Sequence, residues 1–215
     1  MLPQLPTMVA NVYIDGFNLY YGAVRNTPYR WLDIGKSCRF MLPQYQISEI
    51  KYYTALVKGT PGDPKKRVRQ LTYLRALRTI PNLSIIEGHF LSHQVRMPLA
   101  RRIRGVPNHV PVLKTEEKGS DVNMASDLLC DAFRGRYEVA VVVSNDSDLC
   151  RPIRIVKEDL CKKIIVINPH RSSASVQLRR IAEDMKTIKE STLRACQFAS
   201  SLTDHRGTFH KPGSW

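Results

Sequence analysis

Residues 138–148, Glu-Val-Ala-Val-Val-Val-Ser-Asn-Asp-Ser-Asp, hold the pattern on which the fold prediction depends. The β-branched residue Val is favoured in strands, and an uninterrupted apolar run indicates a strand that is covered on both faces. The polar residues that follow would lie where this strand ends. The stretch therefore predicts a buried parallel strand that carries carboxylates at its carboxyl end.

Similar apolar runs recur along the chain and alternate with helical patterns. The other strands are expected at residues 9–14, 50–57, 83–90 and 163–167. Helices are expected at residues 17–24, 31–42, 65–78, 120–133, 147–159 and 175–184. This alternation predicts the α/β class, with three layers (α/β/α) and a central, mostly parallel sheet of about five strands. Residues 1–7 would form a tail, residues 8–190 one domain, and residues 191–215 a C-terminal extension.

Two of the expected helices have assignable faces. In the helix at 65–78, the apolar residues at helical spacing are Val68, Leu71, Leu74 and Leu77. In the helix at 120–133, the expected core face consists of Val122, Ala125, Leu129 and Phe133. Asn123, Asp127 and Asp131 form a polar stripe on that helix, which we expect to face solvent.

Residues 91–117 show no clean periodicity and contain three prolines. Such a length without a recognisable element is unusual in a compact domain and is typical of a functional loop or an irregular insertion. We therefore expect a basic loop at this position.

The charge is strongly positive and unevenly distributed. The 215 residues contain 33 Lys and Arg against 19 Asp and Glu, a net charge of +14. Residues 58–79 carry a net +6 and residues 91–114 a net +5, whereas residues 115–131 carry a net −4. The excess favours a polyanionic partner, either nucleic acid or an anionic membrane surface.

Several classes of protein are disfavoured by what the sequence lacks. No apolar run is long enough to span a bilayer, and the N-terminus does not resemble a signal peptide, so a cytoplasmic location is expected. The five cysteines form no C-x-x-C pair, which disfavours a zinc site. No phosphate-binding loop, G-x-S-x-G turn or H-E-x-x-H helix is present.

Four aspartates are expected at one edge of the predicted sheet. Asp15 ends the first strand, Asp146 and Asp148 follow the strand at 138–143, and Asp121 begins the helix that leads into that strand. Ligands bind at the carboxyl edge of such sheets, and clustered carboxylates repel one another unless a cation neutralises them. Oxygen-only ligands favour Mg²⁺ or Mn²⁺ over zinc.

Each aspartate also has a purely structural explanation. Asp15 and Asp148 stand where a helix N-cap is expected, and Asp121 lies in a first helical turn. Capping does not, however, require these residues to fall at the same sheet edge. The combination therefore favours a metal site over independent caps.

A carboxylate metal site beside basic segments indicates phosphodiester chemistry. Asn18 could orient a carboxylate, a water or the substrate, and Lys118 could contact the scissile phosphate or partly neutralise the carboxylates. Candidates for contacts with the nucleic-acid backbone are Lys65, Lys66, Arg69, Arg101, Arg102 and Arg104. The basic helix at 65–78 has no large apolar face opposite its charges, so a membrane partner is disfavoured.

Three segments resemble the signatures of the NYN domain family, which is part of the PIN-like nuclease superfamily. They are Val12-Tyr13-Ile14-Asp15-Gly16-Phe17-Asn18-Leu19, Lys118-Gly119-Ser120-Asp121 and Val141-Val142-Val143-Ser144-Asn145-Asp146-Ser147-Asp148. The similarity spans roughly residues 8–185.

The resemblance implies a PIN-like fold and a metal-dependent nuclease that generally acts on RNA. By position, it assigns metal binding to Asp15, Asp121, Asp146 and Asp148, and supporting roles to Asn18 and Ser144. The alternative is a non-catalytic nucleic-acid-binding or regulatory module on the same fold, and a homo-oligomer is compatible with either.

Overall fold

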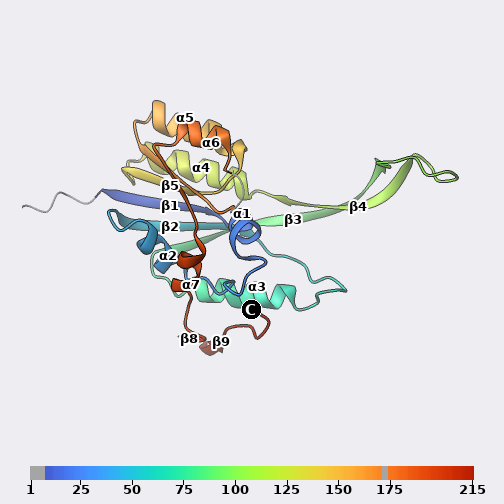
Figure 1. The fold of residues 1–215 in the computed structure, drawn as a ribbon, viewed down its shortest axis with the longest axis horizontal. Coiled ribbons are helices and arrows are strands. Elements are labelled where there is room, and N and C mark those ends of the chain that lie inside the picture. Colours follow the sequence, from blue (N-terminus) through green and yellow to red (C-terminus); the bar gives the residue numbers. More distant parts are fainter. Residues whose placement is uncertain (1–7, 171–173) are drawn as a thin grey trace, which may run out of the picture.

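Strand β1 lies in the middle of a seven-stranded sheet in the computed structural model, which describes residues 8–170 and 174–215 (Figure 1). The strand order is β4-β3-β2-β1-β5-β6-β7. All neighbours pair in parallel except β3 and β4, which are antiparallel. The predicted mostly parallel sheet is thus confirmed, but it has seven strands where about five were expected, because β4 and β7 were not recognised.

The elements alternate along the chain as the pattern of apolar runs predicts. The main sheet contains β1 (Val9–Asp15), β2 (Gln46–Ala55), β3 (Leu83–Pro98), β4 (His109–Lys118), β5 (Val139–Val143), β6 (Lys163–Asn168) and β7 (Asp184–Thr187). The helices are α1 (Gly16–Leu19), α2 (Ile34–Met41), α3 (Lys66–Leu77), α4 (Ser120–Phe133), α5 (Cys150–Glu158), α6 (Val176–Ile181) and α7 (Glu190–Ala195). The remaining elements are the π-helical turn η1 (Tyr20–Val24), the 3₁₀ turn η2 (Ser147–Leu149) and the hairpin β8 (Ser201–Asp204) and β9 (Gly207–His210).

Helices cover both faces of the sheet and give the three expected layers. Helices α2, α3 and α7 lie on one side, and α4, α5 and α6 lie on the other (Figure 1). Alternate residues of β1 face opposite cores: Val12 and Ile14 pack toward the first layer, and Tyr13 packs toward the second. A strand buried on both faces needs apolar side chains at successive positions, which explains the continuous apolar runs in the sequence.

The segment expected to be a loop is instead a long β-ribbon. Strand β3 pairs with β2 from Leu83 to Gly88 and then only with β4, from His89 to Pro98. We call residues 89–118 the arm; it projects from the body of the protein (Figure 1). At about 3.4 Å per residue, its ten paired positions extend roughly 34 Å. Because both faces of the ribbon are open to solvent, no core imposes a period of two on its side chains, and the sequence shows no strand pattern there.

Helix α4 buries a face that overlaps only in part with the one that the sequence predicts, since Leu129 packs against the core but Val122 and Phe133 do not. Val122 and Phe133 are 69% and 82% exposed, whereas Met124, Leu128 and Ala132 are buried against the sheet. The buried residues are spaced four apart, which is equally compatible with one helical face. The prediction failed because α4 carries apolar residues around much of its circumference.

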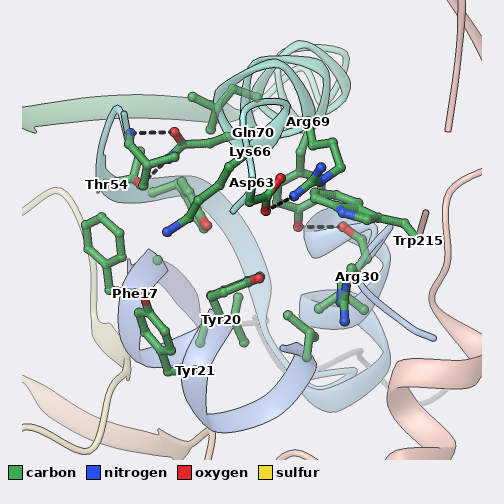
Figure 2. A pocket seen from close by; sticks show the side chains of 18 residues that line it. Phe17, Tyr20, Tyr21, Arg30, Thr54, Asp63, Lys66, Arg69, Gln70 and Trp215 are labelled. Carbon is green, nitrogen blue, oxygen red and sulfur yellow. Dashed lines mark hydrogen bonds and ion pairs between the residues drawn. The ribbon is translucent and has the colours of Figure 1, made fainter. Parts of the chain in front are cut away.

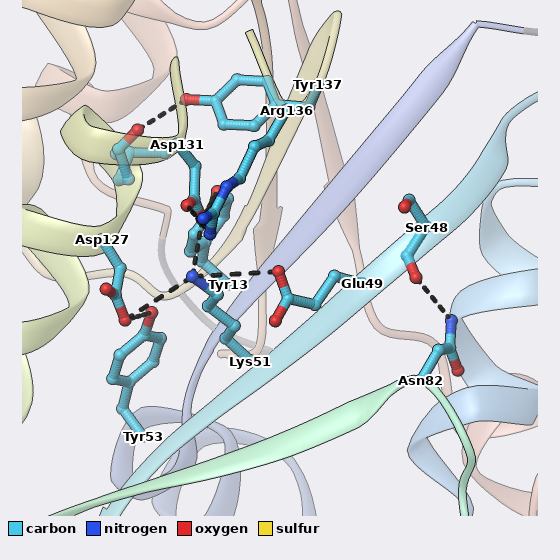
Figure 3. Close-up of polar contacts among 11 residues, drawn as sticks. Tyr13, Ser48, Glu49, Lys51, Tyr53, Asn82, Asp127, Asp131, Arg136 and Tyr137 are labelled. Atoms are coloured by element: carbon cyan, nitrogen blue, oxygen red, sulfur yellow. Dashed lines mark hydrogen bonds and ion pairs between the residues drawn. The ribbon is translucent and has the colours of Figure 1, made fainter. Parts of the chain in front are cut away.

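The polar stripe on α4 also faces inward, where a charged network holds the helix to the sheet (Figure 3). Asp131 is only 1% exposed. Its carboxylate is 2.6 Å from Nζ of Lys51 and 3.0 Å from a guanidinium nitrogen of Arg136, and it accepts a hydrogen bond from the Tyr13 hydroxyl at 2.8 Å. Asp127 is half-buried and accepts a hydrogen bond from Tyr53. The expectation of a solvent-facing stripe was wrong, because these partners replace the water that a carboxylate loses on burial.

The C-terminal segment packs against α3. Arg75 of α3 donates two hydrogen bonds to Asp204, at 2.7 and 2.6 Å, and its guanidinium carbon lies 4.1 Å from the centroid of the Phe209 ring. The Trp215 ring lies edge-on to Trp31 and Tyr73. On the same helix Val68 and Leu71 are 61% and 41% exposed, so only Leu74 and Leu77 join the core as their spacing suggested. In the described part of the chain, no helix is both long and apolar enough to cross a bilayer.

Candidate functional site

The strand order reverses beside β1, and this reversal positions the candidate site. Strand β1 pairs with β2 on one side and with β5 on the other. The connections that leave β1 and β5 therefore diverge to opposite sides and leave a crevice at the carboxyl edge of the sheet, where open α/β sheets bind their ligands.

Asp15, the last residue of β1, lies at this edge and is 6% exposed. Its Oδ1 accepts a hydrogen bond from the backbone N–H of Asn18 at 2.9 Å, so Asp15 caps helix α1. Its Oδ2 accepts a hydrogen bond from the Ser144 hydroxyl at 3.2 Å. Burial raises the pKa of Asp15, while the hydrogen bonds from Asn18 and Ser144 oppose that rise.

Ser144 follows β5 and joins Asp15 to the second acidic segment. Its buried hydroxyl accepts a hydrogen bond from the backbone N–H of Asp146 at 3.1 Å while donating to Asp15. Asp146 is half-buried, and its Oδ1 accepts from the backbone N–H of Asp148. Asp146, not Asp148, therefore caps the turn η2, and Asp148 is exposed within that turn.

Helix α4 brings Asp121 to the same edge. Gly119 precedes the helix with a φ of +100°, a left-handed conformation that side chains rarely adopt, so a glycine is required between Lys118 and Ser120. Glu117 accepts hydrogen bonds from the backbone N–H and the hydroxyl of Ser120, at 3.2 and 2.8 Å. Asp121 then stands in the first turn of α4.

The carboxylates act on one another electrostatically. Partial desolvation, followed by the negative charges of Asp15, Asp146, Glu117 and Asp148, raises the pKa of Asp121 to about 6. Among the described residues, no lysine or arginine forms an ion pair with any of the four predicted aspartates. Lys118 lies next to them in sequence, but its ammonium is 3.5 Å from Glu116. A concentration of negative charge without a counter-charge is the environment that a cation stabilises.

A second hydrogen-bonded group surrounds Asn18. Its Oδ1 accepts from the backbone N–H of Asn145 at 3.1 Å and lies 3.0 Å from Nε2 of His170. The side chain of Asn145 in turn accepts from the backbone N–H of Ser175 at 2.6 Å. Asn18 therefore ties α1 to the loops that follow β5 and β6.

The donor chemistry of this edge fits a hard divalent cation, because every candidate ligand is a carboxylate oxygen. The side chains do not, however, converge: in the parts of the chain that the structure describes, no three His, Cys, Asp or Glu residues stand close enough to hold a metal ion. Both oxygens of Asp15 already accept hydrogen bonds from the protein. The edge therefore has the charge and chemistry of a cation site without a preformed coordination shell.

The predicted basic residues fall into two separate places. Lys66 and Arg69 line a pocket beside α1, and Lys65 is exposed at the start of α3. Arg69 forms an ion pair with Asp63. Arg101, Arg102 and Arg104 are exposed at the tip of the arm, away from the carboxylates (Figure 1).

Two residues that lie at this edge were not predicted from the sequence. Glu117 was not among the predicted site residues, yet it accepts two hydrogen bonds from Ser120 at the start of α4 and adds its charge to the acidic group. His170 was not among the predicted site residues either, yet its ring nitrogen Nε2 lies 3.0 Å from Oδ1 of Asn18. His170 follows β6, so the rule that polar residues after parallel strands share one edge could have identified it.

The fold and this acidic edge define a class of three-layer α/β proteins with carboxylates at the point where strand order reverses. The chain belongs to the NYN domain family, whose model matches residues 9–189. The match includes all four predicted aspartates.

Two individual proteins are also similar to this chain. One is 6-hydroxy-3-succinoylpyridine 3-monooxygenase HspA of Pseudomonas putida, which is 28% identical over 95% of this chain and 74% of its own length. The other is the crystal structure of a protein of unknown function from Vibrio parahaemolyticus, with a TM-score of 0.56 and 18% identity over 87% of this chain and 97% of that one. The second likeness concerns the fold alone.

Proposed function

We propose that this protein is a metal-dependent ribonuclease that hydrolyses phosphodiester bonds at the acidic edge of the sheet. Asp15, Asp121, Asp146 and Asp148 would hold Mg²⁺ or Mn²⁺. The observation that carries the proposal is the gathering of these carboxylates at one sheet edge, where Ser144 links Asp15 to Asp146 through hydrogen bonds. The charges of Asp15, Asp146 and Asp148 also raise the pKa of Asp121. Membership of the NYN domain family supports the same chemistry.

The residues of this chain would have distinct roles in that reaction. A bound divalent cation would polarise the phosphate and lower the pKa of an attacking water. Asp15 is held by Asn18 and Ser144, so its carboxylate would keep a fixed direction toward the cation. The less constrained Asp121 and Asp148 would complete the site by small side-chain movements, which agrees with the lack of a preformed shell.

Positive charge would hold the flanking phosphates of the RNA. Lys65, Lys66 and Arg69 lie on the α3 side of the molecule, and Arg101, Arg102 and Arg104 lie at the arm tip. Because the arm extends roughly 34 Å, the two groups would contact different parts of a long strand rather than one phosphate.

The proposal is tested by incubating purified protein with a labelled single-stranded RNA and Mn²⁺. Asp146→Asn removes one charge with little change of shape, and Asp159→Asn does the same at an exposed position outside the site. Cleavage that Asp146→Asn abolishes and Asp159→Asn leaves intact would support the assignment. Equal cleavage by both variants would refute it.

The relative from Pseudomonas putida raises a second candidate, oxidation of a small aromatic acid. The observation that favours it is the pocket beside α1, which is lined by aromatic rings and basic side chains. Oxygen consumption with 6-hydroxy-3-succinoylpyridine and a supplied reductant would separate the two candidates, because an RNA hydrolase consumes no oxygen.

A further inference from the structure

A pocket of about 170 Å³ lies beside the acidic edge, between α1, η1, the end of β2 and α3 (Figure 2). Its volume is below the roughly 300–1,000 Å³ of pockets that hold drug-sized ligands, so it suits a single ring system. Six aromatic side chains line it: Phe17, Tyr20, Tyr21, Tyr52, Tyr73 and Trp215. Three basic side chains, Arg30, Lys66 and Arg69, share the lining with one acid, Asp63.

The positive charge of this pocket is only partly neutralised. Arg69 is paired with Asp63, but within the described residues the ammonium of Lys66 has no hydrogen bond or ion pair. Figure 2 shows Lys66 reaching from α3 toward Phe17 and Tyr20. Arg30 donates to the backbone oxygen of Arg25 and likewise has no described acidic partner. A half-buried cation without a partner favours an anionic group on a ligand.

The Tyr52 hydroxyl adds a donor to the polar lining. Tyr52 lines the pocket, and its hydroxyl makes no hydrogen bond to any other described residue. A tyrosine phenol is protonated at neutral pH and can donate a hydrogen bond to a ligand. A hydroxyl that faces the pocket without an acceptor in the protein is available to donate to a ligand bound there.

The aromatic wall is organised for a flat ligand. The rings of Phe17 and Tyr21 are stacked with centroids 6.5 Å apart, and Tyr20 lies edge-on to Tyr21. Phe90, at the base of the arm, lies edge-on to Phe17 with ring centroids 5.7 Å apart. Rings held by one another in this way present a pre-formed surface for stacking.

We propose that this pocket binds a planar heteroaromatic ring that carries an anionic group. The aromatic wall would take the ring, Lys66 would pair with the anion, and the Tyr52 hydroxyl would donate to an acceptor on the ring. Two sources supply this chemistry: a nucleotide of a nucleic-acid strand and a free small aromatic acid.

The pocket and the acidic edge share helix α1. Asp15 and Asn18 belong to the acidic edge, whereas Gly16 and Phe17, between them in sequence, line the pocket. A Cβ at Gly16 would come within 2.6 Å of the Tyr52 ring, so only glycine permits α1 to lie this close to β2. A ring bound here would therefore lie next to the carboxylates.

Binding is tested on the full chain without a divalent cation, by ligand-observed NMR titration. The two ring-and-anion probes are uridine 5′-monophosphate and pyridine-3-carboxylate. Ribose 5-phosphate supplies an anion without an aromatic ring, and uridine supplies a ring without an anion. Stacking and a charge-assisted hydrogen bond should lower the dissociation constant of a matching probe roughly tenfold or more below both controls.

Three variants connect the binding to the pocket. Lys66→Met keeps the apolar stem and removes the charge, and Tyr52→Phe removes the hydroxyl alone; each should weaken the matching probe, Lys66→Met by roughly tenfold. Arg67→Met removes the same charge one residue away, outside the pocket, and should leave binding unchanged. Catalytic activity is not needed for any of these readouts, so a failed ribonuclease assay leaves this test intact.

The outcomes separate the two sources. Tighter binding of uridine 5′-monophosphate assigns the pocket to a nucleotide, and tighter binding of pyridine-3-carboxylate assigns it to a small aromatic acid; either supports the proposal. It is overturned if ribose 5-phosphate binds as well as the ring-bearing probes. It is equally overturned if the Lys66→Met and Arg67→Met variants bind the ring-and-anion probes with the same dissociation constant.

Discussion

The hydroxyl of Ser144 donates a hydrogen bond to Oδ2 of Asp15 at 3.2 Å, which joins the ends of β1 and β5 at the candidate site. The same hydroxyl accepts from the backbone N–H of Asp146. Ser144 therefore fixes the relative positions of two of the proposed metal ligands without being a ligand itself.

Replacing Ser144 by alanine should impair Mn²⁺-dependent RNA cleavage by roughly 10- to 100-fold, the usual cost of losing a residue that orients a metal ligand. The partly buried N–H of Asp146 would also lose its partner, which should lower the free energy of unfolding by about 1 kcal/mol. Cleavage rates and urea unfolding measure the two effects. Ser126→Ala, at an exposed position on α4, is the control and should change neither. Unchanged cleavage by Ser144→Ala would contradict the positioning role.

The raised pKa of Asp121 predicts a pH-dependent penalty on folding. Its folded pKa of about 6 exceeds the unfolded value of 3.8, so between these pH values the folded protein binds more protons than the unfolded chain. Stability contributed by the protonated form is therefore lost as the pH rises through this window. Without a divalent cation, Asp121→Asn should raise Tm near neutral pH and change it little near pH 4.

Mn²⁺ should reverse this penalty in the unmodified protein. We expect Mn²⁺ to raise Tm more above the pKa of Asp121 than below it, because the cation competes with protons for the same carboxylates. Thermal unfolding with Mn²⁺ or with a chelator, across the pH range, measures the shift. A Tm shift that is independent of pH, or that Asp121→Asn retains in full, would argue against cation binding at this edge.

The arm should contribute to RNA binding through its arginines. Each phosphate contact on a single strand adds about 0.7 to the slope of log K against log salt concentration. Changing Arg101, Arg102 and Arg104 together to glutamine should make that slope shallower by up to about 2. Changing the exposed Arg39, Arg134 and Arg194 instead should leave the slope as it is. Equal slopes for both triple variants would show that the arm does not contact the strand.

The Lys51–Asp131 pair should be a major contributor to stability. Lys51→Met leaves the buried Asp131 carboxylate with less compensating charge and should lower the free energy of unfolding by about 3–5 kcal/mol. Both side chains of the Arg154–Glu158 pair are exposed. Arg154→Met should therefore lower the free energy of unfolding by less than about 1 kcal/mol. Denaturant unfolding measures both. Similar losses for the two variants would mean that Asp131 is more hydrated than its burial indicates.

The parts of the fold that the sequence predicts are those that a local pattern determines. The apolar run at 139–143 and the polar residues after it suffice to place Asp146 at a sheet edge, and the same reasoning places Asp15.

The features that the sequence does not predict depend on partners distant in the chain. Asp131 is buried because Lys51, eighty residues earlier, supplies its counter-charge. Trp215 reaches the pocket beside α1 only because the C-terminal segment packs on α3. The arm has no core to face, so its strands lack the alternation that would reveal them.

The central claim is that the four aspartates support metal-dependent hydrolysis of RNA. The most direct measurement is the cleavage rate of a labelled RNA as a function of Mn²⁺ concentration, for the unmodified protein and for Asp15→Asn, with Asp159→Asn as control. We predict cleavage that saturates with Mn²⁺, a loss of roughly 100-fold or more in Asp15→Asn, and no change in Asp159→Asn. Cleavage that is independent of Mn²⁺, or that Asp15→Asn retains, would contradict the claim.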